Sequence, residues 1–272
     1  MRPNHKVALV TGASTGIGQA CAAQLASAGF AVYGTSRHPK PANGHGGIPI
    51  MKLDVRDDAS VNSCMKRVLA DSGRIDVLVN NAGVAMEGAV EETSLDEIRS
   101  VMETNFFGAV RMMKAVLPIM RKQGTGRIVN IGSMVAHIPM PFSASYCASK
   151  HALRGFSESL DHEVRNFGIR VSVVEPGFIK TEIVEHSPIA AAPFEPYSSA
   201  RSKPARAFRK QIEQGHEPAL VAAAVLSAAT AEYPRLHYLP DGSANILAAL
   251  RAVLPAPLFD FAFRKGMRIE EG

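Results

Sequence analysis

Cysteine and tryptophan are scarce in this sequence of 272 residues, which has three cysteines and no tryptophan. The cysteines, Cys21, Cys64 and Cys147, are odd in number and form no C-x-x-C pair, so we expect a protein of the reducing cytoplasm. Cys147 and His151 are four residues apart, but no third ligand follows at a suitable spacing, and we expect no metal site. The chain is long enough to bury a large core without a disulfide or a metal.

The sequence also lacks a strong charge bias. Its 30 Lys and Arg residues and 25 Asp and Glu residues leave a net charge of +5, which suits an anionic small molecule as well as a nucleic acid. Five basic residues fall within 201–210, and we interpret them as a solvated helix face, so we expect no nucleic-acid partner. A content of 46% hydrophobic and 20% charged residues excludes a disordered or collagen-like chain.

No apolar run is long and unbroken enough to cross a membrane. The longest stretch without a charged residue, 7–36, contains five glycines and several polar side chains, and the second, 128–149, contains Asn130, His137 and two prolines. A membrane-spanning helix needs about 20 predominantly apolar residues, so neither stretch qualifies. We therefore expect no integral membrane segment and no secretory signal.

Short runs rich in valine and isoleucine alternate with stretches of helical length. The apolar runs are 7–10, 31–33, 48–53, 75–79, 127–131 and 169–174, and the helical stretches are about 16–28, 58–71, 94–122 and 145–166. Continuous apolar runs are typical of parallel strands that are buried on both faces. The repeated order of strand and helix predicts an α/β doubly wound parallel sheet in three layers, the Rossmann fold, as a single domain over 1–272.

The C-terminal third of the chain departs from this order. No strand is expected from Phe178 to Gly215, a segment with four prolines, and a long insertion in a compact α/β chain is usually a functional lid or a disordered loop. We predict a substrate lid at about 178–215. A helix near 218–230 and a short strand near 236–239 should follow. An amphipathic tail at about 244–272 is expected to pack on the domain or on a partner subunit rather than on a membrane.

A glycine-rich turn, Thr11 to Gly18, follows the first predicted strand and opens the first predicted helix. Glycines at 12, 16 and 18 let the backbone approach a phosphate, which the N–H groups and the positive end of the helix then hold. This position between strand and helix favours a dinucleotide site. Residues 12–16 also match G-x-S-x-G, the nucleophile elbow of serine hydrolases, so Ser14 stays open as a nucleophile, although that elbow normally follows several strands.

Arg37 ends the second predicted strand, 19 residues after Gly18. Near that spacing, dinucleotide-binding folds place the residue that contacts the adenosine ribose, and an acidic residue there selects a free 2′-hydroxyl. A guanidinium instead binds a phosphate through two hydrogen bonds, and Ser36, His38 and Lys40 lie close to it in the chain. The sequence therefore predicts NADP(H) rather than NAD(H) as the cofactor.

Tyr146 and Lys150 are four residues apart on a predicted helix, so they share one face. A nearby ammonium favours the phenolate and should lower the pKa of Tyr146 from its ordinary value of about 10. Ser133, thirteen residues before Tyr146, could hydrogen-bond the same substrate oxygen. The group predicts proton transfer to a carbonyl that accepts a hydride, with the phenolate as base in the reverse reaction.

These motifs together resemble the short-chain dehydrogenases/reductases, over the range from Lys6 to about Leu239. The glycine-rich turn is similar to the family's TGxxxGxG, Asn80–Gly83 to its NNAG, and Asp54-Val55 to the pair that touches the adenine. Pro176-Gly177 followed by Thr181 resembles the segment that clasps the nicotinamide carboxamide.

The resemblance also implies the roles of individual residues. Asn105 would anchor a water that relays protons to Lys150, and Lys150 would also hold the nicotinamide ribose. The implied catalytic residues are Asn105, Ser133, Tyr146 and Lys150. The implied cofactor-binding residues are Gly12, Ser14, Thr15, Gly16, Ile17, Gly18, Arg37, Asp54, Val55, Asn81, Ala82, Gly83, Tyr146, Lys150, Pro176, Gly177, Ile179 and Thr181.

Within the family, the chain looks most similar to the branch that includes 17β-hydroxysteroid and retinol dehydrogenases, on Gly34–Arg37, Val174–Gly177, Leu254-Pro255 and Arg264-Lys265. In the family, the stretch between Ser133 and Tyr146 lines the substrate pocket, and here it contains Met134, His137, Met140 and Phe142. The implied function is the NADP(H)-dependent interconversion of a carbonyl and an alcohol on an apolar steroid-like, retinoid-like or other ketone or aldehyde substrate. A homodimer or homotetramer is implied as well.

Three alternatives stay open. The first is a 3-oxoacyl-carrier-protein reductase, whose acidic carrier could suit the basic cluster at 201–210. The second is a non-catalytic protein that senses NADPH on the same fold. The third is a serine hydrolase that uses Ser14 as its nucleophile.

Overall fold

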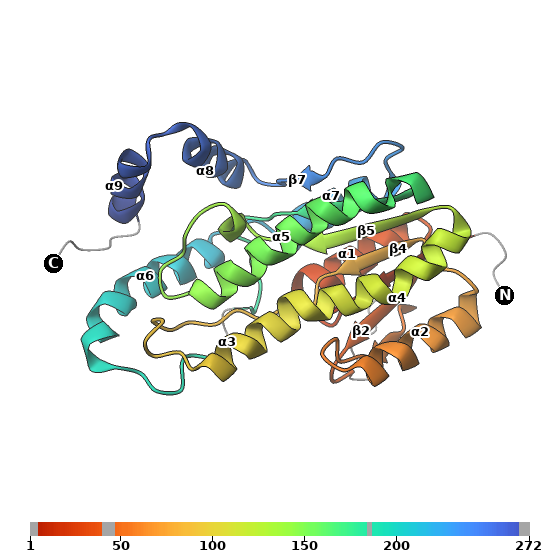
Figure 1. Cartoon of the computed structure of the whole chain (residues 1–272), viewed down its shortest axis with the longest axis horizontal. Coiled ribbons are helices and arrows are strands. Elements are labelled where there is room, and N and C mark those ends of the chain that lie inside the picture. The colour runs from red at the N-terminus through yellow and green to blue at the C-terminus, as the bar shows by residue number, and fades with distance from the viewer. Residues whose placement is uncertain (1–4, 40–46, 184–186, 267–272) are drawn as a thin grey trace.

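A parallel sheet of seven strands forms the centre of the molecule in the computed structural model, which describes residues 5–39, 47–183 and 187–266 (Figure 1). The strand order is β3-β2-β1-β4-β5-β6-β7. The strands are β1 (Val7–Val10), β2 (Ala31–Ser36), β3 (Ile50–Lys52), β4 (Val77–Asn80), β5 (Gly126–Ile131), β6 (Ile169–Val174) and β7 (His237–Tyr238). Each neighbouring pair is parallel, which confirms the predicted fold class.

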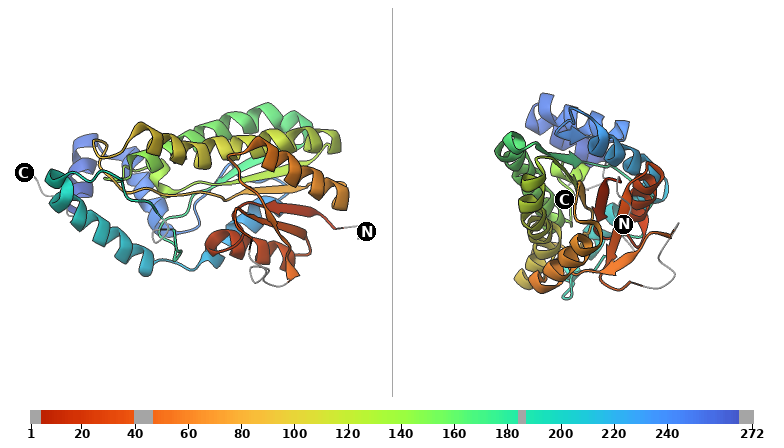
Figure 2. Two further views of the ribbon diagram at one scale, coloured as in Figure 1. Left: turned by 90° about the horizontal axis from the view of Figure 1, so that it is seen from below. Right: turned by 90° about the vertical axis from the view of Figure 1, so that its right-hand side faces the viewer.

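Helices cover both faces of the sheet and complete the three layers (Figure 2). One face carries α2 (Asp58–Ser72), α4 (Gly108–Gln123) and α5 (Ala144–Val164), and the other carries α1 (Gly16–Ser27) and α7 (Pro218–Thr230). Successive residues of β1 alternate between two cores, since Leu9 packs beneath the first group and Val10 beneath the second. Both faces of the strands are buried, which is why their sequences are continuously apolar.

The strand order reverses between β1 and β4, because the chain adds β2 and β3 on one side of β1 and β4 to β7 on the other. In such sheets, ligands bind in the crevice outside the carboxyl ends of the strands at this switch point. The glycine-rich turn follows β1, the Asn80–Gly83 motif begins at the end of β4, and Ser133 lies just beyond β5. The fold therefore gathers the sequence motifs at one edge of the sheet.

The helix predicted over 94–122 is divided in three. It consists of α3 (Leu95–Met102), a π-helical turn η3 (Glu103–Phe107) and α4. Ser94 and Glu97 form a capping box that starts α3, with each side chain bonded to the other's backbone N–H. A π turn keeps the chain helical and inserts a single residue, and the apolar pattern over 94–122 did not reveal it. Asn105 lies in this turn and is 2% exposed.

The remaining predicted helices are close to their expected ranges, and α5 continues into a short 3-10 turn, η5 (Arg165–Phe167). Within the described residues, the predicted lid contains α6 (Glu195–Glu213) and two isolated β-bridges but no strand. The tail contains α8 (Gly242–Val253) and α9 (Ala256–Gly266). Residues 184–186 of the lid and 267–272 of the tail lie outside the described residues.

The predicted lid, with α6, and the tail, with α8 and α9, lie beyond the carboxyl edge of the sheet (Figure 1). Phe259 of α9 is buried in a cluster with Met134 and Met140, the stretch that follows Ser133. The tail thus packs on the same end of the molecule as the motifs. None of the described helices is long and apolar enough to cross a membrane.

Candidate active site

The glycine-rich turn between β1 and α1 has a backbone that side chains would not permit. Gly12 and Gly16 have φ values of +65° and +55°, in the left-handed region that favours glycine. A Cβ atom on Gly18 would lie 2.2 Å from the carbonyl oxygen of Gly12. Thr15 precedes α1 and makes no side-chain hydrogen bond to its first N–H groups, which stay available to a ligand. This geometry suits a bound phosphate.

Asn81 fastens this turn to the end of β4. Its side-chain amide donates to the carbonyl oxygens of Thr11 and Gly12, both at 3.0 Å. In return, the hydroxyl of Thr11 accepts from the backbone N–H groups of Asn81 and Ala82. Two sequence motifs that are separated by some 70 residues are therefore one rigid unit.

Ser14 lies in this turn, but its surroundings do not support a hydrolase. A serine nucleophile needs a histidine within hydrogen-bond distance to remove its proton. Among the described residues, no histidine makes a hydrogen bond with Ser14, and its loop follows the first strand of the sheet.

Asn105 is bonded to the residue that follows the Asn80–Gly83 motif. Its side-chain amide donates to the carbonyl oxygen of Val84 at 2.8 Å and to the hydroxyl of Ser149 at 2.9 Å. Its side-chain oxygen accepts from the N–H of Val84. These contacts occupy the side chain of Asn105, and they join the π turn to α5 and to the loop after Gly83. A Cβ atom added to Gly83 would lie 3.3 Å from Asn105 Oδ1.

Ser133, Tyr146 and Lys150 lie around one cavity of about 900 Å³, which includes the open space at its mouth. Lys150 is 5% exposed and donates from Nζ to the carbonyl oxygen of Ile131 at 2.8 Å. The same Nζ atom is 5.7 Å from the centre of the Tyr146 ring. The predicted proton-transfer group is thus assembled from the end of β5 and the first two turns of α5.

The electrostatics of this group differ from the prediction for tyrosine. Burial raises the pKa of Tyr146 to about 12, and the hydrogen bond from Ser133 offsets only part of that rise. Burial lowers the pKa of Lys150 to about 8. The expectation that the ammonium brings the pKa of Tyr146 below its ordinary value is not met in this structure, because removal from water outweighs it. Tyr146 therefore carries its proton at neutral pH, as a proton donor must.

The cavity brings together ten of the predicted site residues. They are Ile17, Asn81, Gly83, Ser133, Tyr146, Lys150, Pro176, Gly177, Ile179 and Thr181. The other predicted residues lie outside the cavity lining. They are Gly12, Ser14, Thr15, Gly16, Gly18, Arg37, Asp54, Val55, Ala82 and Asn105.

Arg37 lies at the open end of the crevice. It is exposed at the end of β2, where the N–H of Ala13 in the glycine-rich turn donates to the carbonyl oxygen of Thr35 at 2.8 Å. Arg37 forms no hydrogen bond or ion pair with another described residue, whereas Asp54 is paired with Arg56 at 2.7 Å. That pair, with help from Arg37, holds the pKa of Asp54 near 2. Lys40 lies outside the described residues.

Asp241 is a buried residue of the site that sequence reasoning missed. It follows β7, and its carboxylate accepts from the N–H of Gly177 at 2.8 Å. A Cβ atom on Gly177 would lie 2.1 Å from Asp241 Oδ2, so the loop after β6 must be glycine there. A polar residue at the carboxyl end of the last predicted strand was the available signal.

The predicted lid supplies the far wall of the cavity through Phe208 and Ile212 of α6. The sequence predicted that all basic residues of this segment are solvated, but the structure shows that one of them is not. Arg201 is 14% exposed and pairs at 2.5 Å with Glu92, whose side chain is fully buried. Glu92 also accepts from the N–H groups of Phe194 and Ala89. Arg206, Arg209 and Lys210 are exposed, so the interpretation of the cluster was wrong for Arg201.

A sequence profile described as short chain dehydrogenase matches residues 6–190. The chain belongs to the short-chain dehydrogenase family. It is 35% identical over 262 residues to a 3-ketodihydrosphingosine reductase of Bacteroides thetaiotaomicron, which covers 95% of this chain and 97% of that protein. It is 42% identical over 184 residues to the 3-oxoacyl-[acyl-carrier-protein] reductase of Escherichia coli, which covers 65% of this chain and 75% of that protein.

Three solved structures are also similar to this chain. A short-chain dehydrogenase from Streptomyces avermitilis has a TM-score of 0.79 and 36% identity, over 96% of this chain and 98% of that one. A family member from Burkholderia phymatum, solved with NAD, has a TM-score of 0.80 and 25% identity, over 93% of this chain and 94% of that one. ElxO, solved with NADP, has a TM-score of 0.75 and 29% identity, over 89% of this chain and all of that one. The protein is thus an oxidoreductase of a family that binds nicotinamide cofactors.

Proposed function

We propose that this short-chain dehydrogenase uses NADP(H) to interconvert an apolar ketone or aldehyde and its alcohol, with Tyr146 as general acid and base. The observation that carries the proposal is the single cavity that Tyr146, Ser133 and Lys150 share with the Pro176–Gly177 segment. A carbonyl group in this cavity would lie close to the hydroxyl of Tyr146 and also to the Pro176–Gly177 segment, which would hold the nicotinamide. The apolar walls of the cavity, described below, support the choice of substrate.

The residues at the sheet edge fit a dinucleotide. Close approach of a pyrophosphate requires the missing side chains at Gly12 and Gly18 and the exposed N–H groups at the start of α1. Arg37 would hold the 2′-phosphate, since its guanidinium is exposed and lies next to the turn. When bound, the reduced nicotinamide supplies a hydride to the carbonyl carbon.

The protein side of the reaction is a proton transfer. Tyr146 is protonated at neutral pH, because burial raises its pKa to about 12, and it can donate to the oxygen of a carbonyl that is becoming an alcohol. Ser133 would hydrogen-bond the same oxygen. Lys150, with a pKa of about 8, would stabilise the tyrosinate and return a proton to it. Asn105 would support the proton relay to Lys150 through the main chain of its π turn, since its side chain is occupied.

The cavity walls support an apolar substrate with an extended tail. Met134, Met140 and Phe178 line the cavity together with Phe208 and Ile212 of α6. A second, open pocket shares Ala85, Met140, Ser143 and Phe208 with the first and continues along α6 to Ala205. A chain attached to the carbonyl carbon could follow this path. The name of the 3-ketodihydrosphingosine reductase relative describes a ketone of the same apolar kind.

The 3-oxoacyl-carrier-protein reductase activity is a second candidate. Arg206, Arg209 and Lys210 are exposed on α6, next to the cavities, and an acidic carrier would meet them there. The relative from Escherichia coli bears that name. A carrier substrate should then have a much lower KM than the same acyl group on a small thiol, and this difference should disappear at high salt.

Assembly as a homodimer or homotetramer is also part of the proposal. Exposed Phe107 and Phe156 lie on the outer face of η3 and α5, together with the small exposed residues Ala144 and Ala148. Such a face favours close packing of helices between subunits. We further propose a cytoplasmic location, which the three free cysteines support. Light scattering of the purified protein measures the subunit number.

A screen of ketones, aldehydes and alcohols by NADPH absorbance tests the proposed function. We expect turnover of apolar ketones that improves with chain length. Binding of NADPH without turnover of any compound would favour a sensing protein. Labelling of Ser14 by a fluorophosphonate would favour a hydrolase.

A further inference from the structure

Glu175 is a fully buried carboxylate that the proposed reaction does not use. It lies between the end of β6 and the Pro176–Gly177 segment, and its side chain is 0% exposed. A buried charge is costly unless it is paired and hydrogen-bonded. Burial would raise the pKa of this carboxyl, but hydrogen bonds from two histidines outweigh it and hold the pKa below its usual range.

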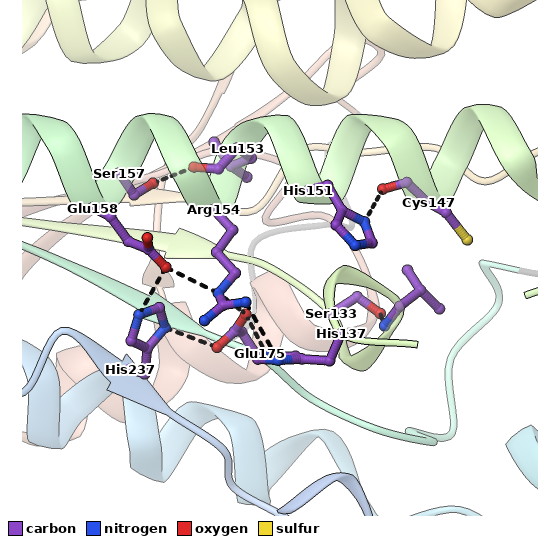
Figure 3. A network of polar contacts seen from close by, with 11 residues as sticks. Ser133, His137, Cys147, His151, Leu153, Arg154, Ser157, Glu158, Glu175 and His237 are labelled. Atoms are coloured by element: carbon purple, nitrogen blue, oxygen red, sulfur yellow. Dashed lines mark hydrogen bonds and ion pairs between the residues drawn. The ribbon is translucent and has the colours of Figure 1, made fainter. Parts of the chain in front are cut away.

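The partners of Glu175 come from three different elements (Figure 3). His137, which ends the short 3-10 helix η4 (Met134–Ala136), approaches Oε1 with Nε2 at 2.9 Å. His237 of β7 approaches Oε2 with Nδ1 at 2.9 Å. Arg154 reaches from α5 and places Nε 3.5 Å from Oε1. We call these residues, together with Glu158, the Glu175 cluster.

Each of the two histidines links Glu175 to a second charged side chain. His237 faces Glu175 with Nδ1 at 2.9 Å and Glu158 with Nε2 at 3.2 Å. His137 accepts with Nδ1 from the guanidinium of Arg154 at 3.4 Å and donates with Nε2 to the carboxylate of Glu175. The cluster therefore combines two carboxylates with one guanidinium and two imidazole rings.

The Glu175 cluster is joined by short backbone links to the proposed catalytic groups. Ser133 caps η4 at the end opposite His137, and the N–H of Met134 donates to the carbonyl oxygen of Pro176 at 2.9 Å. Arg154 lies one helical turn beyond Lys150 on α5. A single side chain therefore connects the serine loop, the segment after β6 and the helix of Tyr146.

We propose that Glu175 is a positioning residue, which holds Ser133 and the Pro176–Gly177 segment at the spacing that carbonyl reduction requires, acting through His137. It does so without touching substrate or cofactor. This inference rests on the proposed function, because it assumes that Ser133 orients the substrate oxygen. A packed apolar group could fill the same volume, but it would not fix His137 by a directional bond.

Glu175→Gln tests this role with almost no change in shape. Glutamine has one side-chain oxygen, so it cannot accept from both histidines, and its NH₂ group must face a donor nitrogen. We expect kcat to fall about 10–100-fold, the range for a misplacement of about 1 Å, with unchanged affinity for NADPH. Unchanged kcat in a folded Glu175→Gln protein overturns the proposal.

Asp161→Asn is the matched control. Asp161 is also fully buried on α5 and is paired with Arg165 and Arg170, but it lies three helical turns beyond Lys150. Both variants should lower the melting temperature, because each loses a buried charge from an ion-pair cluster. Only Glu175→Gln should lower kcat. An equal fall in kcat for Asp161→Asn would mean that a general loss of stability explains the effect.

A double-mutant cycle with Ser133→Ala identifies the route. If Glu175 acts through Ser133, Glu175→Gln should have little further effect on kcat in the Ser133→Ala background. Full multiplication of the two effects overturns that route. A wild-type protein that turns over no carbonyl compound contradicts the proposed function itself, so the two failures are distinguishable.

His137 gives an independent measurement should Glu175→Gln not fold. His137→Gln keeps a donor near the position of Nε2, and His137→Leu removes it. We expect His137→Gln to retain most of kcat and His137→Leu to lose it to the same degree as Glu175→Gln. Equal activity of the two His137 variants overturns the proposal.

Discussion

The two sides of the cavity are built by different means. On the cofactor side, Gly18 and Gly177 lie so close to their neighbours that a single added Cβ atom would clash, and Asn81 bonds to the carbonyl oxygens of the glycine-rich turn. On the substrate side, α6 is held by side chains, chiefly the pair of Arg201 with Glu92 and apolar contacts of Phe208. The first side tolerates almost no change in shape, whereas the second can change its side chains and keep its fold.

This difference matches the two tasks of the site. A nicotinamide dinucleotide presents the same phosphates and rings to every family member, so one backbone geometry serves all of them. Substrates differ, and a helix held by a few side-chain contacts can be altered to admit another shape. Mutations on the cofactor side should therefore act on cofactor binding, and those on the substrate side on KM for the substrate.

Gly18→Ala should have the largest effect on the cofactor side. The added Cβ would lie 2.2 Å from a backbone oxygen, so the turn must open and lose its fit to the pyrophosphate. We expect NADPH binding to fall by more than about 100-fold, the scale of two lost hydrogen bonds to a charged group. Calorimetry measures this. Gly155→Ala on α5 is the control, because its Cβ meets nothing within 4 Å. Similar binding by both variants would contradict the steric account.

The buried ammonium of Lys150 should make stability depend on pH. Its pKa is about 8 in the folded protein and 10.5 in its ordinary state. Between these values the unfolded chain holds a proton that the folded chain has released, so stability rises with pH. Relative to Lys150→Met, the free energy of unfolding of the wild-type protein should rise by up to about 3 kcal/mol as the pH rises from 8 to 10.5. Chemical denaturation at several pH values measures this, with Lys66→Met at an exposed site as control. A constant difference would contradict it.

Arg37→Asp should change the choice of cofactor. In the wild-type protein, charge-assisted hydrogen bonds of about 1.5–3 kcal/mol to the 2′-phosphate should favour NADPH over NADH by roughly 10–100-fold in kcat/KM. The carboxylate repels that phosphate and accepts from a free 2′-hydroxyl, so the variant should lose most of its activity with NADPH. Equal use of NADH and NADPH by the wild-type protein would show that Arg37 does not select the phosphate.

Arg201→Ala should have the smallest effect and should act on the substrate side. Glu92 would keep only its two backbone donors, so α6 would be held less firmly over the cavity. We expect KM for an apolar ketone to rise about two- to ten-fold, with kcat and NADPH affinity nearly unchanged. Arg206→Ala on the same helix is the control, because its described hydrogen bond is to Ser202 of its own helix. A larger loss of NADPH affinity than of substrate affinity would contradict the division between the two sides.

The cofactor side could be predicted from the sequence because its key residues follow local spacing patterns. The spacing of Gly12, Gly16 and Gly18 after an apolar run is visible in the sequence, as is the four-residue spacing of Tyr146 and Lys150. The order of strands and helices followed from continuous apolar runs and helical stretches. These features depend on neighbours within a few residues.

The remaining features depend on partners far along the chain. Glu92 and Arg201 are 109 residues apart, and Glu175 and His137 are 38 apart, so no spacing rule joins them. In the sequence, Arg201 is one of five basic residues within 201–210. Its pairing with the buried carboxylate of Glu92 could not be predicted from the sequence. The pKa of Tyr146 was mispredicted for the same reason, since burial is set by the whole fold.

Tyr146→Phe, compared with the wild-type protein, tests the central claim most directly. Both proteins are given NADPH and the best ketone of the screen, and cofactor binding is measured beside the rate of NADPH oxidation. The phenylalanine ring still packs, but the transferable proton is lost, and a general acid typically contributes 10²–10⁴-fold. We predict a fall in kcat at or beyond the upper end of that range, with NADPH affinity retained. A Tyr146→Phe protein that keeps near-normal kcat would show that Tyr146 is not the acid.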